Sequence, residues 1–113
     1  MFSELFGKKN YRNLSQTEAK KKLDLGEPVV LLDVRSPEEY AQVHIPGSVS
    51  LPLDRLADGI SKVASKDSEL LIYCQSGMRA ATASRLLSSL GYTNINNIGG
   101  IQTWKYETEK GRR

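Results

Sequence analysis

The single cysteine of the chain opens the segment CQSGMR, residues 74–79, which ends on an arginine. A cysteine attacks other molecules as its thiolate, and an ordinary thiol, with a pKa of about 8.5, is only slightly ionised at neutral pH. Gly77 can adopt the positive φ that turns backbone N–H groups inward around one point, and Arg79 adds a positive charge. The segment therefore predicts a nucleophilic thiolate among N–H donors. The alternative is an inert thiol buried at the end of a strand.

The residues on either side of this segment predict the elements that position it. An apolar run over residues 69–73 predicts a buried strand directly before Cys74, and apolar residues at helical spacing predict a helix over residues 79–90. Gly91 is expected to end this helix. Because the N-terminus of the helix points at the loop, its free N–H groups should add to the positive potential around the thiol.

Strands and helices alternate along the rest of the sequence. Capping boxes that begin at Ser15 and Ser36 predict two helix starts, the second with Pro37 at the first helical position. The expected elements are a helix over residues 16–24, a strand over 29–33, a short helix from Pro37 that the segment His44 to Gly47 ends, a strand over 49–53, a helix over 54–63, a strand over 94–98, a turn at Gly99 and Gly100, and a terminal helix over 101–110. Such alternation is typical of an α/β domain with a mostly parallel sheet, whose sites lie beyond the carboxyl ends of the strands.

The composition excludes several classes of protein. A chain of 113 residues with 39% hydrophobic and 26% charged residues is expected to build one core, and its apolar runs are too short to cross a membrane. The net charge of +3 is spread over helix faces and a basic tail, which does not indicate a nucleic-acid surface. One cysteine and one histidine predict neither a disulfide nor a metal site. The N-terminus lacks the pattern of a secretory signal, so we expect a cytoplasmic protein.

Other residues could support the site or only the fold. Asp33 and Arg35 end the first buried strand and could place charges near the loop, although such residues more often pair with each other. His44 is expected to be a structural turn residue, because a thiolate that is already formed needs no base. Trp104 is expected to anchor the terminal helix to the sheet.

The segment at Cys74 resembles the active-site loop of rhodanese-like domains, C-x-x-G-x-R, and three further segments resemble the same family in the same order. These segments are Leu32-Asp33-Val34-Arg35 with Glu38-Glu39-Tyr40, then His44-Ile45-Pro46-Gly47-Ser48, and last Gly99-Gly100 with Trp104. The resemblance runs from about Ser15 to Trp104. It implies a three-layer α/β domain over residues 14–110, with a mostly parallel five-stranded sheet flanked by helices on both faces. Residues 1–13 would then form an N-terminal extension, weakly ordered or used for docking, and residues 111–113 a basic tail.

The resemblance also implies a reaction, that of a single-domain sulfurtransferase. Cys74 would attack the outer sulfur of a donor, thiosulfate or a persulfide, and would keep that sulfur as a persulfide. The loop residues Gln75, Ser76, Gly77, Met78 and Arg79 would bind the donor and the persulfide, and no cofactor is expected. Because the chain has no second cysteine, cyanide, a cellular thiol or a sulfur-accepting protein must remove the sulfur. Two half-reactions predict ping-pong kinetics.

Two alternatives remain from the sequence. The chain could be a rhodanese-like module that binds a partner or delivers sulfur with little turnover of small donors. Related phosphatases and arsenate reductases use a loop one residue longer than the segment from Cys74 to Arg79, which makes those activities less favoured. Arg79 is the only charge of the loop, which is less positive charge than a site for thiosulfate alone would need, so another persulfide is a candidate for the physiological donor beside thiosulfate.

Overall fold

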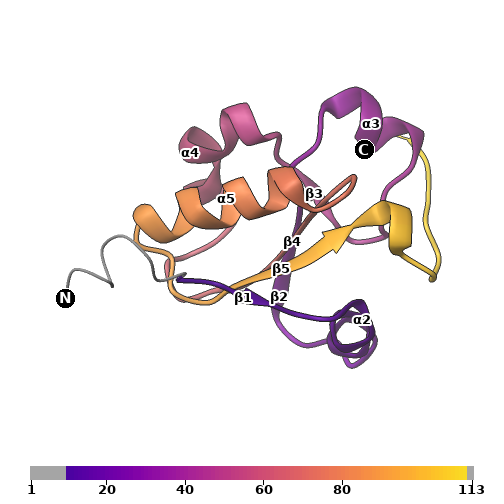
Figure 1. Ribbon diagram of the computed structural model, residues 1–113, viewed down its shortest axis with the longest axis horizontal. Coiled ribbons are helices and arrows are strands. Elements are labelled where there is room, and N and C mark those ends of the chain that lie inside the picture. The colour runs from indigo at the N-terminus through magenta and orange to yellow at the C-terminus, as the bar shows by residue number, and fades with distance from the viewer. Residues whose placement is uncertain (1–9, 112–113) are drawn as a thin grey trace.

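The sheet of this protein has five parallel strands in the order β1-β5-β4-β2-β3, as seen in the computed structural model, which describes residues 10–111 (Figure 1). The strands are β1 (Arg12–Asn13), β2 (Val29–Asp33), β3 (Val49–Ser50), β4 (Glu69–Cys74) and β5 (Ile95–Gly100). The helices are α2 (Gln16–Asp24), α3 (Pro37–Gln42), α4 (Leu56–Gly59) and α5 (Met78–Ser89), with 3₁₀ turns at Leu53–Arg55, Ile60–Lys62 and Ile101–Thr103. Figure 1 shows α2 on one side of the sheet and α4 and α5 on the other, so the expected three-layer α/β architecture is confirmed. No helix within residues 10–111 is long and apolar enough to cross a membrane.

Side-chain alternation along the central strands builds a core on each face of the sheet. In β4, Leu70, Ile72 and Cys74 face the cluster that contains α4 and α5, whereas Leu71 and Tyr73 face the cluster that contains α2. Strand β2 pairs with β4 along its whole length and is likewise apolar on both faces. This is the pattern that a parallel sheet covered by helices requires. Cys74 therefore ends its strand on the same side as α5.

Local signals set the helices that lie nearest to the carboxyl ends of the strands. The Ser36 hydroxyl accepts a hydrogen bond from the Glu39 N–H, and the Glu39 carboxylate accepts one from the Ser36 N–H, so the predicted capping box of α3 is complete. The bounds of α2 match the predicted residues 16–24, and α5 begins one residue earlier than predicted. Gly91, at a φ of +98°, follows α5 as expected.

Two predicted elements of the middle region are shorter than expected. The strand predicted over 49–53 stops at Ser50, because Pro52 has no N–H to donate and the Leu53 N–H bonds back to the Val34 carbonyl. The helix predicted over 54–63 is a series of short turns around the four-residue α4. Gly59, a poor helix former, ends that α-helical part.

The terminal helix predicted over 101–110 is wrong. Only Ile101–Thr103 form a 3₁₀ turn, and the backbone of Trp104 is already extended. The chain then crosses to the segment that follows α3, where Glu109 and His44 exchange both backbone hydrogen bonds as an antiparallel bridge. A helix could not make this bridge, since its N–H groups would be used within the helix. Trp104 still packs against the α2 side of the core, as predicted for an anchor.

The ends of the sequence differ in part from the predicted domain division. Arg12 and Asn13, assigned from the sequence to the N-terminal extension, form the edge strand β1 beside β5. Residues 1–9 of that extension and residues 112–113 of the basic tail lie outside the described residues. Gly111 donates its N–H to the Ala41 carbonyl at 2.8 Å, so the ordered contacts continue beyond residue 110.

Truncation of a core leucine tests the central strand. Leu32 of β2 is fully buried, so Leu32→Ala should lower the free energy of unfolding by about 3 kcal/mol through lost apolar burial and the cavity left behind. Leu25 is 69% exposed at the end of α2, so Leu25→Ala should change the free energy of unfolding by no more than about 0.5 kcal/mol. Urea unfolding followed by circular dichroism measures both. Equal losses in the two variants would contradict the assigned core.

Candidate active site

The thiol of Cys74 lies at the carboxyl end of β4, beneath the loop that leads into α5. Its sulfur accepts hydrogen bonds from the backbone N–H groups of Gly77, at 3.0 Å, and Ala80, at 3.3 Å. Gly77 has a φ of +110°, which allows the loop to turn its N–H toward the sulfur. Ala80 lies in the first turn of α5, where backbone N–H groups have no partner within the helix. Both donors favour a negative charge on the sulfur.

The thiol of Cys74 is buried, although the loop around it is largely exposed. Only 1% of Cys74 is exposed, whereas Gln75 and Ser76 of the loop are exposed and Met78 is 78% exposed. A reactant can therefore reach the Cys74 sulfur only by entering the loop or by displacing the side chains of the loop. The sulfur thus combines a low-dielectric surrounding with fixed donors, a combination that strengthens electrostatic stabilisation of an anion.

Strand β5 supports the loop from below by backbone contact. A Cβ atom on Gly100 would lie 2.1 Å from the Gln75 carbonyl oxygen and 2.6 Å from the Ser76 Cα, distances that no side chain can occupy. The Gln102 N–H also donates to the Gln75 carbonyl, at 3.2 Å. The sequence predicted a turn at Gly99 and Gly100, but both belong to β5. Gly100 is needed for this close approach of two backbones.

Arg79 ends the loop in an ion pair with Glu39 of α3. Its Nη1 and Nη2 atoms donate to the Glu39 Oε1 and Oε2 atoms at 2.8 and 3.0 Å, a two-bond fork between planar groups. Hydrogen bonding to Arg79 is the main cause that lowers the pKa of Glu39 from 4.5 to about 2. Hydrogen bonding to Glu39 is likewise the first cause that raises the pKa of Arg79, and the charge of Cys74 adds a smaller effect. The guanidinium group therefore lies within electrostatic reach of the thiol.

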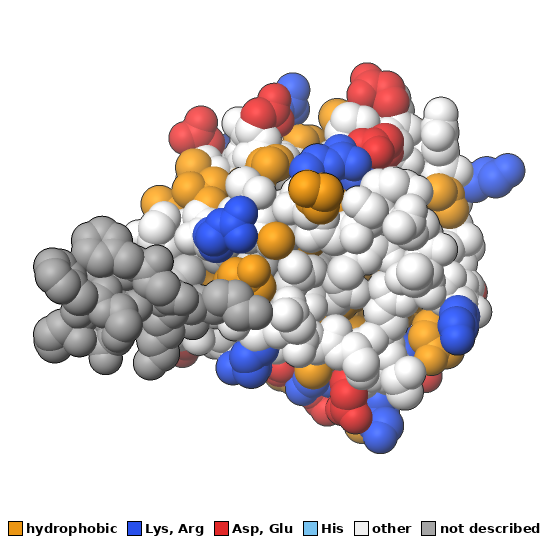
Figure 2. Space-filling view, in the orientation of Figure 1, with side chains coloured by type: hydrophobic (Ala, Val, Ile, Leu, Met, Phe, Trp, Pro, Cys, Tyr) orange, Lys and Arg blue, Asp and Glu red, His pale blue; other side chains and the backbone are white. Residues whose placement is uncertain are grey.

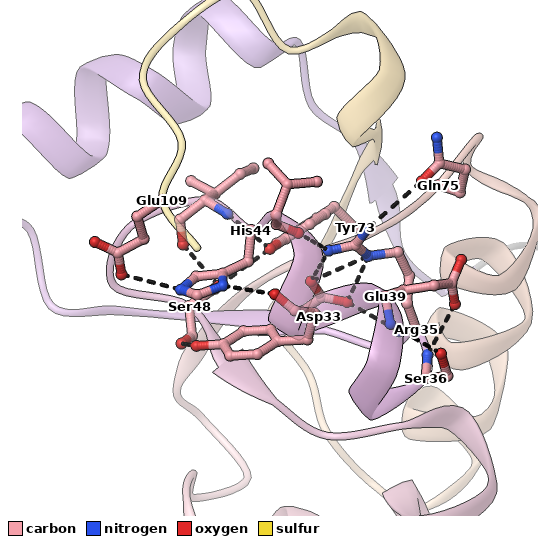
Figure 3. A network of polar contacts seen from close by, with 12 residues as sticks. Asp33, Arg35, Ser36, Glu39, His44, Ser48, Tyr73, Gln75 and Glu109 are labelled. Atoms are coloured by element: carbon pink, nitrogen blue, oxygen red, sulfur yellow. Dashed lines mark hydrogen bonds and ion pairs between the residues drawn. The ribbon is translucent and has the colours of Figure 1, made fainter. Parts of the chain in front are cut away.

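Asp33 and Arg35 form a second ion pair, fully buried behind the loop (Figure 3). Arg35 donates to both carboxylate oxygens of Asp33 and to the Val43 carbonyl, and its Nη1 lies 3.4 Å from the Gln75 Oε1. Burial opposes the charge on Arg35, but the hydrogen bonds and the charge of Asp33 outweigh burial and raise its pKa. The two residues pair with each other, as the structural interpretation of the sequence expected. Through Gln75 the pair also reaches the loop.

The remaining polar residues of Figure 3 stabilise the surrounding fold. The hydroxyl of Tyr73 accepts from the Ile45 N–H and contacts the Ser48 hydroxyl, both at 3.0 Å, and burial raises the pKa of Tyr73. His44 stacks on Tyr40 and contacts Glu109 through Nε2 at 3.0 Å. These contacts fit the structural role that the sequence predicted for His44.

The structure places the predicted loop residues 74–79 in one turn, in which the Gly77 N–H contacts the Cys74 sulfur, Ser76 and Met78 are exposed and Arg79 pairs with Glu39. Asp33 and Arg35 lie behind this turn and reach it through Gln75. Sequence reasoning missed Glu39 as the partner of Arg79 and Gly100 as the support of the loop. In the sequence, Glu39 ends a capping box and Gly100 belongs to a predicted turn, and both lie in segments that resemble the rhodanese-like family, but none of these signals indicated what either residue contacts. Within residues 10–111, no cluster of three or more His, Cys, Asp or Glu side chains could hold a metal ion.

Comparison with known proteins places this geometry in a family. A family model described as a rhodanese-like domain matches residues 15–107. The thiosulfate sulfurtransferase PspE of Escherichia coli (strain K12) is 36% identical over 72 residues, which are 63% of this chain and 69% of that protein. The thiosulfate:glutathione sulfurtransferase of Saccharomyces cerevisiae is 36% identical over 110 residues, covering 84% of this chain and 78% of that protein. The rhodanese-like domain from Anabaena sp., solved by NMR, has a TM-score of 0.81 at 27% identity, over 87% of this chain and 78% of that one.

A methyl group on Gly100 tests the backbone contact beneath the loop. Gly100→Ala should lower the free energy of unfolding by about 2 kcal/mol or more, because the new atom meets rigid backbone. The displaced loop should also lose protection of the Gly77 and Ala80 amides in hydrogen exchange measured by NMR. Gly59→Ala is the matched control, since its methyl group meets only the end of the Leu51 side chain, which can move. Unchanged protection in Gly100→Ala would contradict the assigned support.

The lowered pKa of Glu39 predicts a specific dependence of stability on pH. The ion pair stabilises the fold fully above pH 4.5, and this contribution is lost as pH falls toward the folded-state pKa of about 2. Since Arg79 is 40% exposed, solvent screening reduces the contribution to about 1 kcal/mol. Urea unfolding at a series of pH values should show the advantage of wild type over Glu39→Gln shrinking between pH 4.5 and 2. In the background of Arg79→Gln, the same comparison should show little change. If the difference in free energy of unfolding between wild type and Glu39→Gln stayed constant at all pH values, the assigned ion pair between Glu39 and Arg79 would be contradicted.

Proposed function

Because the chain belongs to the rhodanese-like domain family, we propose that it transfers sulfane sulfur through a persulfide on Cys74. The names of its relatives support sulfur transfer as the general activity. The observation that carries the proposal is the sulfur atom of Cys74, held at the end of β4 by two backbone N–H donors. Such donors favour the thiolate that the first step requires, without a general base.

In the first half-reaction the Cys74 thiolate attacks the outer sulfur of the donor. The Cys74 S–S bond forms as the S–S bond of the donor breaks, and the leaving group departs with that electron pair. Thiosulfate would release sulfite, and an alkyl persulfide would release the alkyl thiolate. The new terminal sulfur carries the negative charge, and the N–H groups of the loop would hold it in turn.

In the second half-reaction an acceptor thiolate or cyanide attacks the terminal sulfur. The bond to Cys74 breaks, its electron pair returns to the Cys74 sulfur, and the acceptor leaves as a persulfide or as thiocyanate. The acceptor must be external, because the chain has no second cysteine to form a disulfide. The yeast relative named thiosulfate:glutathione sulfurtransferase supports a low-molecular-weight thiol in this role. Since Cys74 must return to the thiolate in each cycle, we expect the protein to work in the reducing cytoplasm.

The burial of Cys74 would protect the persulfide intermediate from thiols and oxidants in solution. A persulfide in free solution exchanges with thiols and oxidises, whereas a sulfur inside the loop meets only reactants that enter it. Only 1% of Cys74 is exposed, and the N–H donors are fixed by Gly77 and by the first turn of α5. The loop therefore would select reactants by size and charge before the sulfur is transferred.

Loading of one sulfur atom on Cys74 tests the proposal. After incubation with thiosulfate and removal of small molecules, intact-mass analysis should show wild type heavier by one sulfur atom, and cyanide should return the original mass with formation of thiocyanate. Cys74→Ser should show no gain, because a hydroxyl does not attack sulfane sulfur at neutral pH. Thiocyanate formation should fall by at least about three orders of magnitude with the loss of the nucleophile. No mass gain in folded wild type with either thiosulfate or an alkyl persulfide would exclude the proposed activity.

A further inference from the structure

The charged side chains around the loop compensate each other in pairs. Both outer nitrogens of Arg79 are engaged by Glu39, and Arg35 is engaged by Asp33. Figure 2 shows acidic and basic side chains next to each other over α3 and the start of α5. The sum of these four charges is zero, so the positive potential at Cys74 comes mainly from the N–H groups of Gly77 and Ala80.

Glu39 is placed to control how much of the Arg79 charge reaches a reactant. It lies at the third position of α3, where its capping bond to the Ser36 N–H fixes its carboxylate. The Glu39 Oε1 atom accepts from both this N–H and Arg79, so the helix start and the ion pair share one atom. The carboxylate is about one-third exposed, and its bond to the Ser36 N–H keeps it in position to pair with Arg79. The pair is therefore a fixed feature of the site rather than an occasional surface contact.

We propose that Glu39 sets the charge of the sulfur donor: by holding Arg79 in a neutral pair, it makes the loop favour donors with one negative charge, such as alkyl persulfides, over the thiosulfate dianion. This inference rests on the proposed sulfur transfer and names its donor class. The Gly77 and Ala80 N–H groups already compensate the charge of the Cys74 thiolate, so they offset little of the charge that a donor brings to this enclosed site. Arg35 and Arg79, the cations described next to the loop, are both paired, so a dianion would bring one more uncompensated charge into the site than a monoanion, and such burial is costly. Glu39 acts through Arg79 and is a positioning residue.

A pair of donors that differ by one charge tests the proposal. Thiosulfate and methanethiosulfonate both carry a terminal sulfur, and they release sulfite and methanesulfinate when the Cys74 thiolate takes it. The measurement is kcat/KM for each donor with cyanide as acceptor, expressed as the ratio of thiosulfate to methanethiosulfonate. The ratio cancels any effect of a variant on the thiolate itself, because both donors react with the same sulfur.

Glu39→Gln keeps an oxygen for the capping bond but removes the charge that neutralises Arg79. The ratio should then rise about five-fold, mainly through a lower KM for thiosulfate, since a freed cation attracts the dianion more than the monoanion. Arg79→Gln leaves the carboxylate unpaired, and the ratio should fall by about the same factor. The double variant should return to near the wild-type ratio. The rise in Glu39→Gln should shrink at high ionic strength, because salt screens the freed charge.

Glu38→Gln is the matched control. Glu38 is the exposed neighbour of Glu39 in α3, and its replacement changes the net charge of the protein by the same amount. Its ratio should equal that of wild type. The proposal is overturned if the ratio stays unchanged in Glu39→Gln and Arg79→Gln, if it rises equally in Glu38→Gln, or if the rise persists in the double variant. Should Glu39→Gln fail to fold, Arg79→Gln alone decides, since an unchanged or higher ratio would contradict the proposal. Absence of turnover with both donors in wild type would instead overturn the proposed function itself.

Discussion

The hydrogen bonds from the Gly77 and Ala80 N–H groups to the Cys74 sulfur are the interaction on which the site depends. They require that the loop turns at Gly77, that α5 begins directly after it, and that β4 ends with the sulfur on the α5 side of the sheet. These conditions depend on the course of the backbone and on packing, and no single side chain provides them. The backbone provides the donors, and the packing of β4, β5 and α5 holds them in place.

Two ion pairs then fix the loop from different sides. The buried pair of Asp33 and Arg35 joins the end of β2 to the Val43 carbonyl and reaches Gln75, while the partly exposed pair of Glu39 and Arg79 joins α3 to α5. A buried pair gains little net stability over apolar residues, but removal of one partner leaves an uncompensated charge. Such pairs therefore specify one arrangement of the segments around the loop more than they stabilise the whole fold.

The elements that were predictable from the sequence are those set by local signals. Continuous apolar runs predicted β2 and β4, apolar residues at helical spacing predicted α5, and the motif at residues 74–79 placed the site at the end of β4. Contacts between distant segments were not visible. Glu39 and Arg79 stand 40 residues apart, and Gly100 has the local preference of a turn until the Gln75 carbonyl is known to lie against it. The prediction of a terminal helix was wrong for the same reason, because the bridge between the distant residues His44 and Glu109 outweighs the local helical preference.

The use of backbone donors for the sulfur separates reactivity from recognition in the loop. The side chains of Ser76 and Met78 face outward and donate nothing to the sulfur, although both residues stand within the turn that encloses it. Substitutions at these two positions can therefore change which molecules approach while the thiolate keeps its donors. A loop built in this way lets evolution, or a protein engineer, vary the reactants of one sulfur chemistry without rebuilding the chemistry itself.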